Sequence, residues 1–453
     1  MSFIKKIGLI FIFVTIPLIL FGQTQRWVFQ YNGQTGVSDD FAHSVIYGAD
    51  GNIYAAGLTN LGDTICDFTI ISTTNTGALR WVYQYYDYVF WGHRNIAKSL
   101  VYGLDGNIYA AGVYSYSLYP SILVVSLTNS GTERWTYSPL YGARTLEDRP
   151  ISIICGPDSN IYGSGTVVNE VTNAEDIIVF SLTPSGTERW VYTYNGTGNS
   201  SDFSTSMTAD SNGNIYVVGS SMGANGNMDI IVIKLSPTGI QQWVARYNGP
   251  DNGNDFGNSI VFGSDGYVYI AGTCWRANTS YDFLVLSLSS YSGGVIWLYS
   301  YNGPGNSVDI AKAITFGADG WVYAAGFTTG AGTKTDFTII KLSFGISGFI
   351  YRYNGTDNSF DCANSIVYGT DSNIYAAGYI ISNTTKDDFT IISLTNTGTY
   401  RWAYLFNDPL NSSDEARSIV YGTDGNIYSA GYSAGGSTTF DFTLISLGVS
   451  LHK

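Results

Sequence analysis

Aspartates recur at two fixed positions along this chain, and paired carboxylates are groups that could do chemistry. The first series follows a regularly spaced tryptophan, or Phe349 in its place, by twelve to fourteen residues and comprises Asp40, Asp148, Asp202, Asp255, Asp309, Asp361 and Asp414. The second series comprises Asp67, Asp176, Asp229, Asp282, Asp336, Asp388 and Asp441. Carboxylates in this arrangement could bind cations or provide the acid and base of a glycosidase.

A structural task is the alternative, in which each aspartate accepts backbone N–H groups and holds its own loop. Recurrence in almost every repeat favours this alternative, because a single site would need only one or two of the copies. The oxygen-rich loops Asp251–Asp255 and Asp357–Asp361 are the best candidates for calcium, with Asp251, Asp255, Asp357 and Asp361 as weak candidate ligands. We expect no other cofactor.

The second repeat departs from the pattern, since Asn95 and Ser121 stand where the other repeats have aspartates. Its loops are aromatic instead of polar. Such a cluster could stack on sugar rings or anchor a partner protein, or its two loops could simply pack on each other. The candidate ligand- or partner-binding residues are Tyr86, Tyr88, Phe90, Trp91, His93, Arg94, Tyr114, Tyr116 and Tyr119, together with Trp275 and Arg276 in the equivalent loop of the fifth repeat.

Other catalytic machinery is not evident. The chain has only three histidines, His43, His93 and His452, and they occupy unrelated settings. Neither a Ser, His and acid arrangement nor a phosphate-binding glycine loop occurs. We therefore name no catalytic residue and do not expect an enzyme, while a polysaccharide hydrolase or lyase that uses the carboxylates stays open as an alternative.

These residues are positioned by an internal repeat whose most regular part is Asp-Gly-Asn-Ile-Tyr-Ala-Ala-Gly, present unchanged at residues 50–57 and 105–112. Six edited copies follow. The final glycines are 52 to 55 residues apart and lie at Gly57, Gly112, Gly165, Gly219, Gly272, Gly326, Gly378 and Gly431. A fixed period of this length indicates one body of stacked units rather than several domains.

Each unit contains four short apolar segments that end in Gly, Asn, Asp or Ser, which is typical of strands and turns. Helical periodicity is absent after the amino-terminal segment. Small four-stranded sheets bury both faces only by packing side by side, and a closed ring achieves this for all of them. The sequence predicts an all-β fold, an eight-bladed β-propeller of four-stranded antiparallel blades. Small Ala-Ala-Gly side chains would let adjacent blades approach near the axis.

The last repeat lacks a tryptophan strand of its own, whereas the chain begins with a spare one at Trp27–Tyr31. We therefore expect the amino-terminal strand to become the outermost strand of the last blade. This pairing would close the ring without a covalent bond.

The repeat unit resembles the β-propeller repeats of secreted bacterial proteins over the whole chain after its amino-terminal segment. The Ser/Thr-Gly-x-x-x-Trp piece, as in Ser130–Trp135 and Ser185–Trp190, is also similar to the tryptophan-docking turn of eight-bladed quinoprotein propellers. That motif has an aspartate eight residues before the tryptophan, where this chain has Leu127 and Leu182. Vicinal cysteines are missing as well. The first resemblance implies an extracellular or surface module with no activity common to its members.

The amino terminus predicts export. Lys5 and Lys6 precede an apolar run at residues 7–21, which is short for a membrane span of roughly 20 residues. We assign residues 1–22 to a cleaved signal peptide and residues 23–453 to one propeller domain, located in the periplasm, at the cell surface or in the medium. We expect no membrane insertion after cleavage. The four cysteines lie in non-adjacent repeats and should be free thiols.

The formal net charge of −14 disfavours nucleic acid as a partner, because its phosphates would be repelled. We expect a monomeric binding or scaffold module that contacts a glycan or a protein through the loop face bearing the aspartates. An envelope-assembly scaffold is the remaining alternative.

Overall fold

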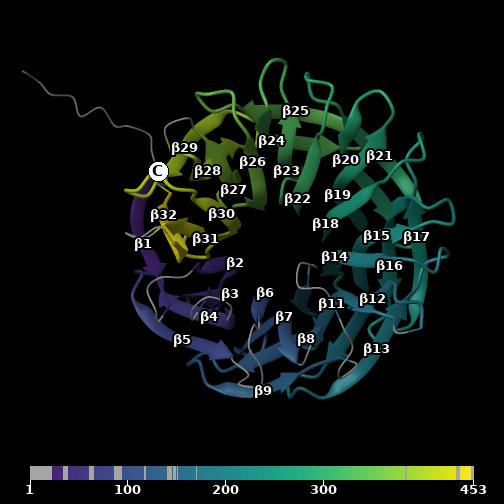
Figure 1. The fold of residues 1–453 in the computed structure, drawn as a ribbon, viewed down its shortest axis with the longest axis horizontal. Helices are drawn as coiled ribbons and strands as arrows, with labels where there is room; N and C mark the ends of the chain where they lie inside the picture. Colours follow the sequence, from purple (N-terminus) through teal and green to yellow (C-terminus); the bar gives the residue numbers. More distant parts are fainter. Residues whose placement is uncertain are drawn as a thin grey trace, which may run out of the picture.

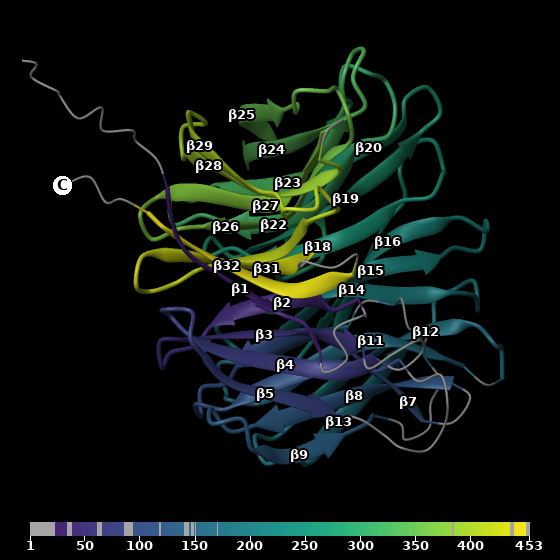
Figure 2. The same cartoon turned by 60° about the vertical axis from the view of Figure 1, so that its left-hand side comes forward.

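The computed structural model describes residues 23–33, 39–60, 66–85, 94–116, 119–139, 145, 149, 151–169, 171–382, 385–434 and 439–449. The segment predicted to be a signal peptide lies outside these residues. The described residues form eight four-stranded antiparallel sheets arranged as blades around one axis, and they contain no α-helix (Figures 1 and 2). In this part of the chain no helix could cross a bilayer. The predicted eight-bladed, all-β fold is confirmed.

The strands of the first four blades, from the axis outward, are as follows. Blade 1 has β2 (Phe41–Tyr47), β3 (Asn52–Asn60), β4 (Cys66–Thr74) and β5 (Leu79–Tyr85). Blade 2 has β6 (Ile96–Tyr102), β7 (Ile108–Tyr116), β8 (Tyr119–Leu127) and β9 (Glu133–Tyr137). Blade 3 has β10 (Ser152–Cys155), β11 (Ile161–Val168), β12 (Glu175–Leu182) and β13 (Glu188–Tyr194). Blade 4 has β14 (Asp202–Ala209), β15 (Ile215–Met222), β16 (Met228–Leu235) and β17 (Gln241–Tyr247).

The other four blades repeat the order. Blade 5 has β18 (Phe256–Phe262), β19 (Tyr267–Arg276), β20 (Ser280–Ser289) and β21 (Val295–Tyr301). Blade 6 has β22 (Ile310–Phe316), β23 (Val322–Thr329), β24 (Thr335–Ser343) and β25 (Ile346–Tyr353). Blade 7 has β26 (Asp361–Tyr368), β27 (Asn373–Ile381), β28 (Asp387–Thr395) and β29 (Tyr400–Phe406). Blade 8 has β30 (Glu415–Tyr421), β31 (Asn426–Ala434), β32 (Phe440–Gly448) and, outermost, β1 (Thr24–Tyr31).

The ring closes through β1, as the sequence predicts. This strand pairs antiparallel with β32 from Thr24 opposite Gly448 to Tyr31 opposite Phe442 (Figure 1). The first strand of the chain therefore completes the last blade, and it supplies that blade with the tryptophan its own repeat lacks.

The hydrophobic core lies between the blades. Seven of the eight clusters of buried apolar side chains join two adjacent blades and one spans blades 1, 2 and 3, so every interface around the ring is filled. Between blades 1 and 2, for example, Tyr54 and Ala56 pack with Ala97 and Leu100. Small side chains on the second strand thus do allow close approach between blades.

The glycine that ends the repeated motif has a different cause from the one expected. A Cβ on Gly57 would lie 1.9 Å from the carbonyl oxygen of Phe41, which belongs to the inner strand of the same blade. The inner strand has a β-bulge here, with a register shift between Ala42 and Ser44. The bulge pushes the backbone of the inner strand against the second strand, and only glycine leaves room for it.

Adjacent blades are also joined at their outer edges by the tryptophans. The indole N–H of Trp81 donates to the carbonyl of Asn129 in the next blade at 3.0 Å. The ring packs on Gly131, whose φ is +85° and whose missing Cβ would lie 2.6 Å from the indole. Trp27, Trp135, Trp190 and Trp243 make the same bond to the next turn along the ring.

We expect the closing strand to contribute strongly to stability. Trp27→Ala removes the indole bond to Asn75 and the packing on Gly77, and should destabilise the fold by about 3–4 kcal/mol. Calorimetric unfolding would measure the loss, and Leu79→Ala, at an exposed position of an outer strand, is the control. Deletion of residues 23–33 should lower the melting temperature further. An unchanged melting temperature after the deletion would contradict non-covalent closure by β1.

Candidate functional site

The loop face is the side of the ring where inner strands begin and where second strands connect to third strands. The aspartates of the first series lie on this face, one before each inner strand. Except for Asp148, which lies outside the described residues, every one of them is fully buried. They therefore lie beneath the loops and do not project into solvent.

Five of the six described first-series carboxylates hold two loops together, and Asp202 accepts the backbone N–H of Gly196. Asp40 accepts the backbone N–H groups of Gly33 at 2.6 Å and Asn60 at 2.7 Å. Its own N–H donates to the carbonyl of Phe440 in blade 8 at 2.7 Å. Asp255, Asp309, Asp361 and Asp414 accept an equivalent pair of N–H groups. The described members of the series thus perform the structural task that was one of the two predictions.

Burial makes these carboxyl groups weaker acids than exposed aspartates. It raises the pKa of Asp40, Asp309 and Asp361 to about 6 against an ordinary value of 3.8, although the backbone bonds act in the opposite direction. Burial together with the neighbouring carboxylate of Asp408 raises the pKa of Asp414 to about 8. Asp408, which is 1% exposed, stands where the corresponding loop of blade 1 has Gly33.

The second series also lies in the interior. Its members are at most 7% exposed. In addition to burial, their charges raise the pKa of first-series aspartates in the following blade, as Asp229 does for Asp255 and Asp282 for Asp309. The carboxylates therefore come together across blade interfaces, not within one blade. Asp229 is paired with Arg246 at 2.8 Å and Asp336 with Arg352. Among the buried atoms of the described residues, both carboxylate oxygens of Asp67 lack a hydrogen-bond partner.

The calcium candidates do not converge. Asp255 and Asp361 are buried and accept backbone N–H groups, while the exposed Asp251 accepts the N–H of Ala277 at 3.2 Å. Within the described residues, no three His, Cys, Asp or Glu side chains lie close enough together to hold a metal ion.

The aromatic candidates are described only in part. Tyr86, Tyr88, Phe90, Trp91 and His93 lie outside the described residues, as do the side chains of Tyr116 and Tyr119. Tyr114 is 5% exposed and its ring meets that of Tyr85 edge to face at 6.2 Å.

The smaller candidate pair lies on β19 of blade 5. Trp275 is half-buried, and its ring packs on Gly253 of the Asp251–Asp255 loop. Arg276 is 3.7 Å from the carboxylate of the buried Asp282.

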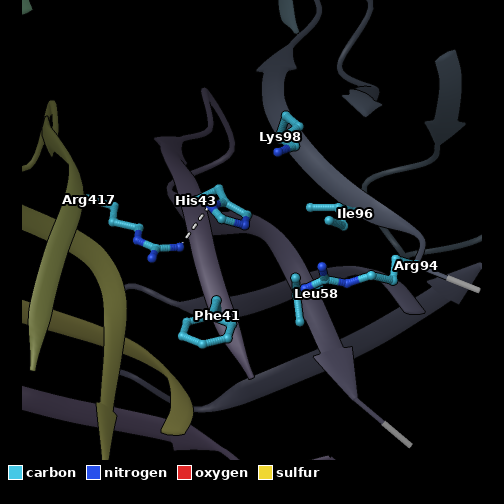
Figure 3. A pocket seen from close by; sticks show the side chains of 7 residues that line it. All are labelled: Phe41, His43, Leu58, Arg94, Ile96, Lys98 and Arg417. Atoms are coloured by element: carbon cyan, nitrogen blue, oxygen red, sulfur yellow. Dashed lines mark hydrogen bonds between the residues drawn. The ribbon is translucent and has the colours of Figure 1, made fainter. Parts of the chain in front are cut away.

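A pocket of about 440 Å³ opens between blades 8, 1 and 2 and is lined by Phe41, His43, Leu58, Arg94, Ile96, Lys98 and Arg417 (Figure 3). Three of these side chains are cationic and none is acidic. Of the seven, the sequence singled out only Arg94. We call this hollow the axial pocket, because His43, Lys98 and Arg417 come from the inner strands β2, β6 and β30 (Figure 1).

The bulge of the inner strand explains why these side chains meet. His43, Lys98 and Arg417 are the residues skipped by the register shift in their strands, so they leave the ladder. Each lies three residues after the first-series position of its repeat, at Asp40, Asn95 and Asp414. Counting this offset along the repeats would have found His43, Lys98 and Arg417 from the sequence, but not Arg94.

Arg417 is held in place by several contacts. Its Nη1 lies 3.1 Å from His43 Nδ1, and its guanidinium carbon lies 5.1 Å from the ring centre of Phe41. Its Nε is 3.5 Å from the carboxylate of Glu415. Burial, followed by the charges of Arg417 and Lys98, holds the pKa of His43 well below its ordinary value of 6.5. His43 is therefore neutral at physiological pH.

Residues 192–227 match the family model described as Beta-propeller repeat. A comparison with curated protein sequences gave no significant match. The solved structure of BamB from Moraxella catarrhalis is 13% identical, with a TM-score of 0.54 over 94% of this chain and 100% of that one.

Two further solved structures are similar over most of this chain. Sqt1 from Chaetomium thermophilum is 10% identical, with a TM-score of 0.55 over 94% of this chain and 98% of its own. Quinohemoprotein alcohol dehydrogenase from Comamonas testosteroni is 12% identical, with a TM-score of 0.55 over 93% of this chain and 76% of its own. At these identities the likeness extends to the propeller fold, which these chains share with the present one.

The high pKa of Asp414 predicts an unusual pH dependence of stability. Between pH 3.8 and about 8 the native carboxyl keeps a proton that the unfolded chain releases, so the free energy of unfolding falls as pH rises through this window. One such proton gives a slope of up to about 1.4 kcal/mol per pH unit. Asp414→Asn should flatten the decline between about pH 6.5 and 8, where Asp40, Asp309 and Asp361 are already ionised.

Denaturant unfolding at several pH values would measure this slope. The exposed Asp251→Asn is the matched control and should leave the slope as it is in the wild type. An equal slope in the wild type and in Asp414→Asn would show that the native carboxyl does not retain its proton.

Chelation should leave the fold unchanged. The carboxylate oxygens of Asp255 and Asp361 already accept backbone N–H groups, which leaves them poorly placed to coordinate calcium. We expect the same melting temperature with millimolar calcium and with excess chelator. A drop on chelation, restored by calcium, would demonstrate a structural ion.

Proposed function

We propose that this chain is an exported, non-catalytic binding module whose contact surface is the loop face, centred on the axial pocket. The observation that carries the proposal is the contrast between the two kinds of charge on this face. The described aspartates of the two repeated series are buried, whereas Arg94, Lys98 and Arg417 line an open hollow. A charged and partly apolar hollow of this size suits a ligand or a projecting group of a partner.

The contrast also favours binding over hydrolysis. A glycosidase places two carboxyl groups on either side of the bond that it cleaves, about 5–10 Å apart. The axial pocket is lined by no carboxyl group, and the first-series aspartates that the structure describes are hydrogen-bonded within the loops. A hydrolase or lyase would therefore need carboxyl groups other than the first-series aspartates and away from the pocket lining.

The partner on this surface is a glycan or a protein. Export follows from the apolar run at residues 7–21 behind two lysines. With a net charge of −14, the chain as a whole repels anions at long range. The basic pocket can attract an anionic group only at short range, so it would select a partner through direct contacts.

Charge reversal in the pocket should test this role. The chain from residue 23 and its Arg94→Glu/Lys98→Glu variant would be compared on a glycan array and, for protein ligands, on an array of purified envelope proteins. We expect the wild type to bind a discrete set of ligands and the variant to lose at least tenfold in affinity for them. Lys312→Glu is the matched control, because Lys312 occupies the same bulge position in blade 6 but does not line the pocket.

Two results would contradict the proposal. One is ligand binding that the double variant retains at full affinity, which would place the contact surface elsewhere. The other is release of products by the wild type from a panel of polysaccharides, which would make the chain an enzyme.

A further inference from the structure

We propose that the axial pocket binds a small organic anion through its carboxylate, which Arg417, Lys98 and Arg94 would neutralise while His43 donates a hydrogen bond. The inference rests on the proposed function, since it names the ligand chemistry of the same site. It is carried by the convergence of four nitrogen-bearing side chains on one hollow (Figure 3).

The cationic groups approach the hollow from three blades. In Figure 3 the guanidinium of Arg417 enters from the side of blade 8, beside His43, while Lys98 and Arg94 lie on the opposite side. Glu415 is the acidic group nearest to Arg417 and does not line the pocket. One anion within the hollow would thus face three positive charges and no carboxylate of the lining. Guanidinium and ammonium groups bind carboxylates by charge-assisted hydrogen bonds.

His43 contributes a neutral donor. A guanidinium can only donate, so the 3.1 Å contact with Arg417 makes Nδ1 of His43 the acceptor. A neutral imidazole carries one N–H, which must then lie on Nε2. Figure 3 shows this second nitrogen on the side of the ring away from Arg417, toward Ile96 and Lys98. An anionic oxygen suits this donor, because its lone pair can accept the hydrogen bond from the N–H.

The rest of the lining specifies the body of the ligand. Phe41, Leu58 and Ile96 are apolar, and Leu58 and Ile96 are at most 5% exposed. A volume of about 440 Å³ lies within the range of pockets for small molecules. An inorganic ion would leave the apolar wall unused. A carboxylate on a compact, partly apolar body would use both kinds of surface, and a uronic acid or the terminal carboxylate of an acylated amino acid has this chemistry.

At the corresponding bulge positions of blades 4, 5 and 6, the side chains make different contacts. Thr205 and Asn258 use their side chains to bond the backbone of the following blade, with Thr205 reaching Gly257 at 2.7 Å and Asn258 reaching Ala311 at 2.8 Å. Lys312 donates to Asn364 at 2.8 Å, and Asn364 donates to Glu415. Lys312 is therefore linked through Asn364 to the acidic group of Glu415, and it does not line the pocket.

Titration calorimetry with small ligands tests the inference. Glucuronate, N-acetylglycine, glucose and sulfate would be titrated into the wild type, Lys98→Gln and Lys312→Gln. We expect glucuronate to bind the wild type, to lose at least tenfold in affinity with Lys98→Gln, and to be unaffected by Lys312→Gln. Glucose, which has the same ring without the carboxylate, should not bind. Thermal unfolding of each variant would check that the ring is intact.

The four ligands distinguish a site for one kind of carboxylate from a site for carboxylates in general. Binding of glucuronate alone would indicate a sugar acid, and equal binding of N-acetylglycine would indicate a site for carboxylates in general; both support the inference. Equal binding of glucose, stronger binding of sulfate, no binding of either carboxylate, or an unchanged affinity with Lys98→Gln would overturn it. A ligand from the array that is neutral yet sensitive to the double variant would leave the proposed function standing while this inference fails.

If Lys98→Gln fails to fold, Arg94→Gln provides the same readout from another lining residue. Each variant removes one positive charge from the pocket, so both should weaken glucuronate binding. Weakening by neither variant would again overturn the inference.

Discussion

The two-sided hydrophobic character of each blade is the constraint on which the rest of this structure depends. A four-stranded sheet with buried side chains on both faces has no stable form alone, and the eight clusters that join neighbouring blades satisfy all these faces only when the circle is complete. The repeated second strand follows from this need, because its alanines lie at the interfaces. The tryptophans of the outer strands reinforce the same interfaces at the rim.

The described first-series aspartates of the loop face hold neighbouring segments of the ring together. A carboxylate that accepts two N–H groups from different loops, while its own N–H bonds to the preceding blade, fixes the place where three segments meet. The cost is a set of buried carboxyls that ionise reluctantly. Around Asp414 the cost is greatest, because Asp408 adds a second carboxylate where blade 1 has a glycine.

Much of this architecture could be predicted from the sequence, because each sequence repeat corresponds to one blade. The eight-blade ring and its closure by β1 follow from the period and the displaced tryptophan strand. The structural task of the aspartates was also foreseen. The axial pocket was not, since His43 and Arg417 are far apart in sequence and their meeting depends on a bulge and on closure.

Glycine positions show the same limit on a smaller scale. The sequence indicates that Gly57 is required, but the reason expected was the adjacent blade. The steric contact is with Phe41 of its own blade, because the bulge changes which backbone atoms are opposed. The aromatic loops of the second repeat remain a prediction, since most of their side chains lie outside the described residues.

Closure by the first strand also has a consequence for the order of synthesis. β1 is synthesised before the other described strands, yet its partner β32 is made more than 400 residues later, so this pair has the longest sequence separation among the described strand pairs. Until the last residues emerge, blade 8 cannot exist and the strand that will complete it has nothing to pair with. An incomplete chain therefore exposes unpaired backbone at the open ends of its ring, where proteases and other unfinished chains can bind. Pairing of β1 with β32 hides both ends, so a chain that lacks either strand keeps an open ring.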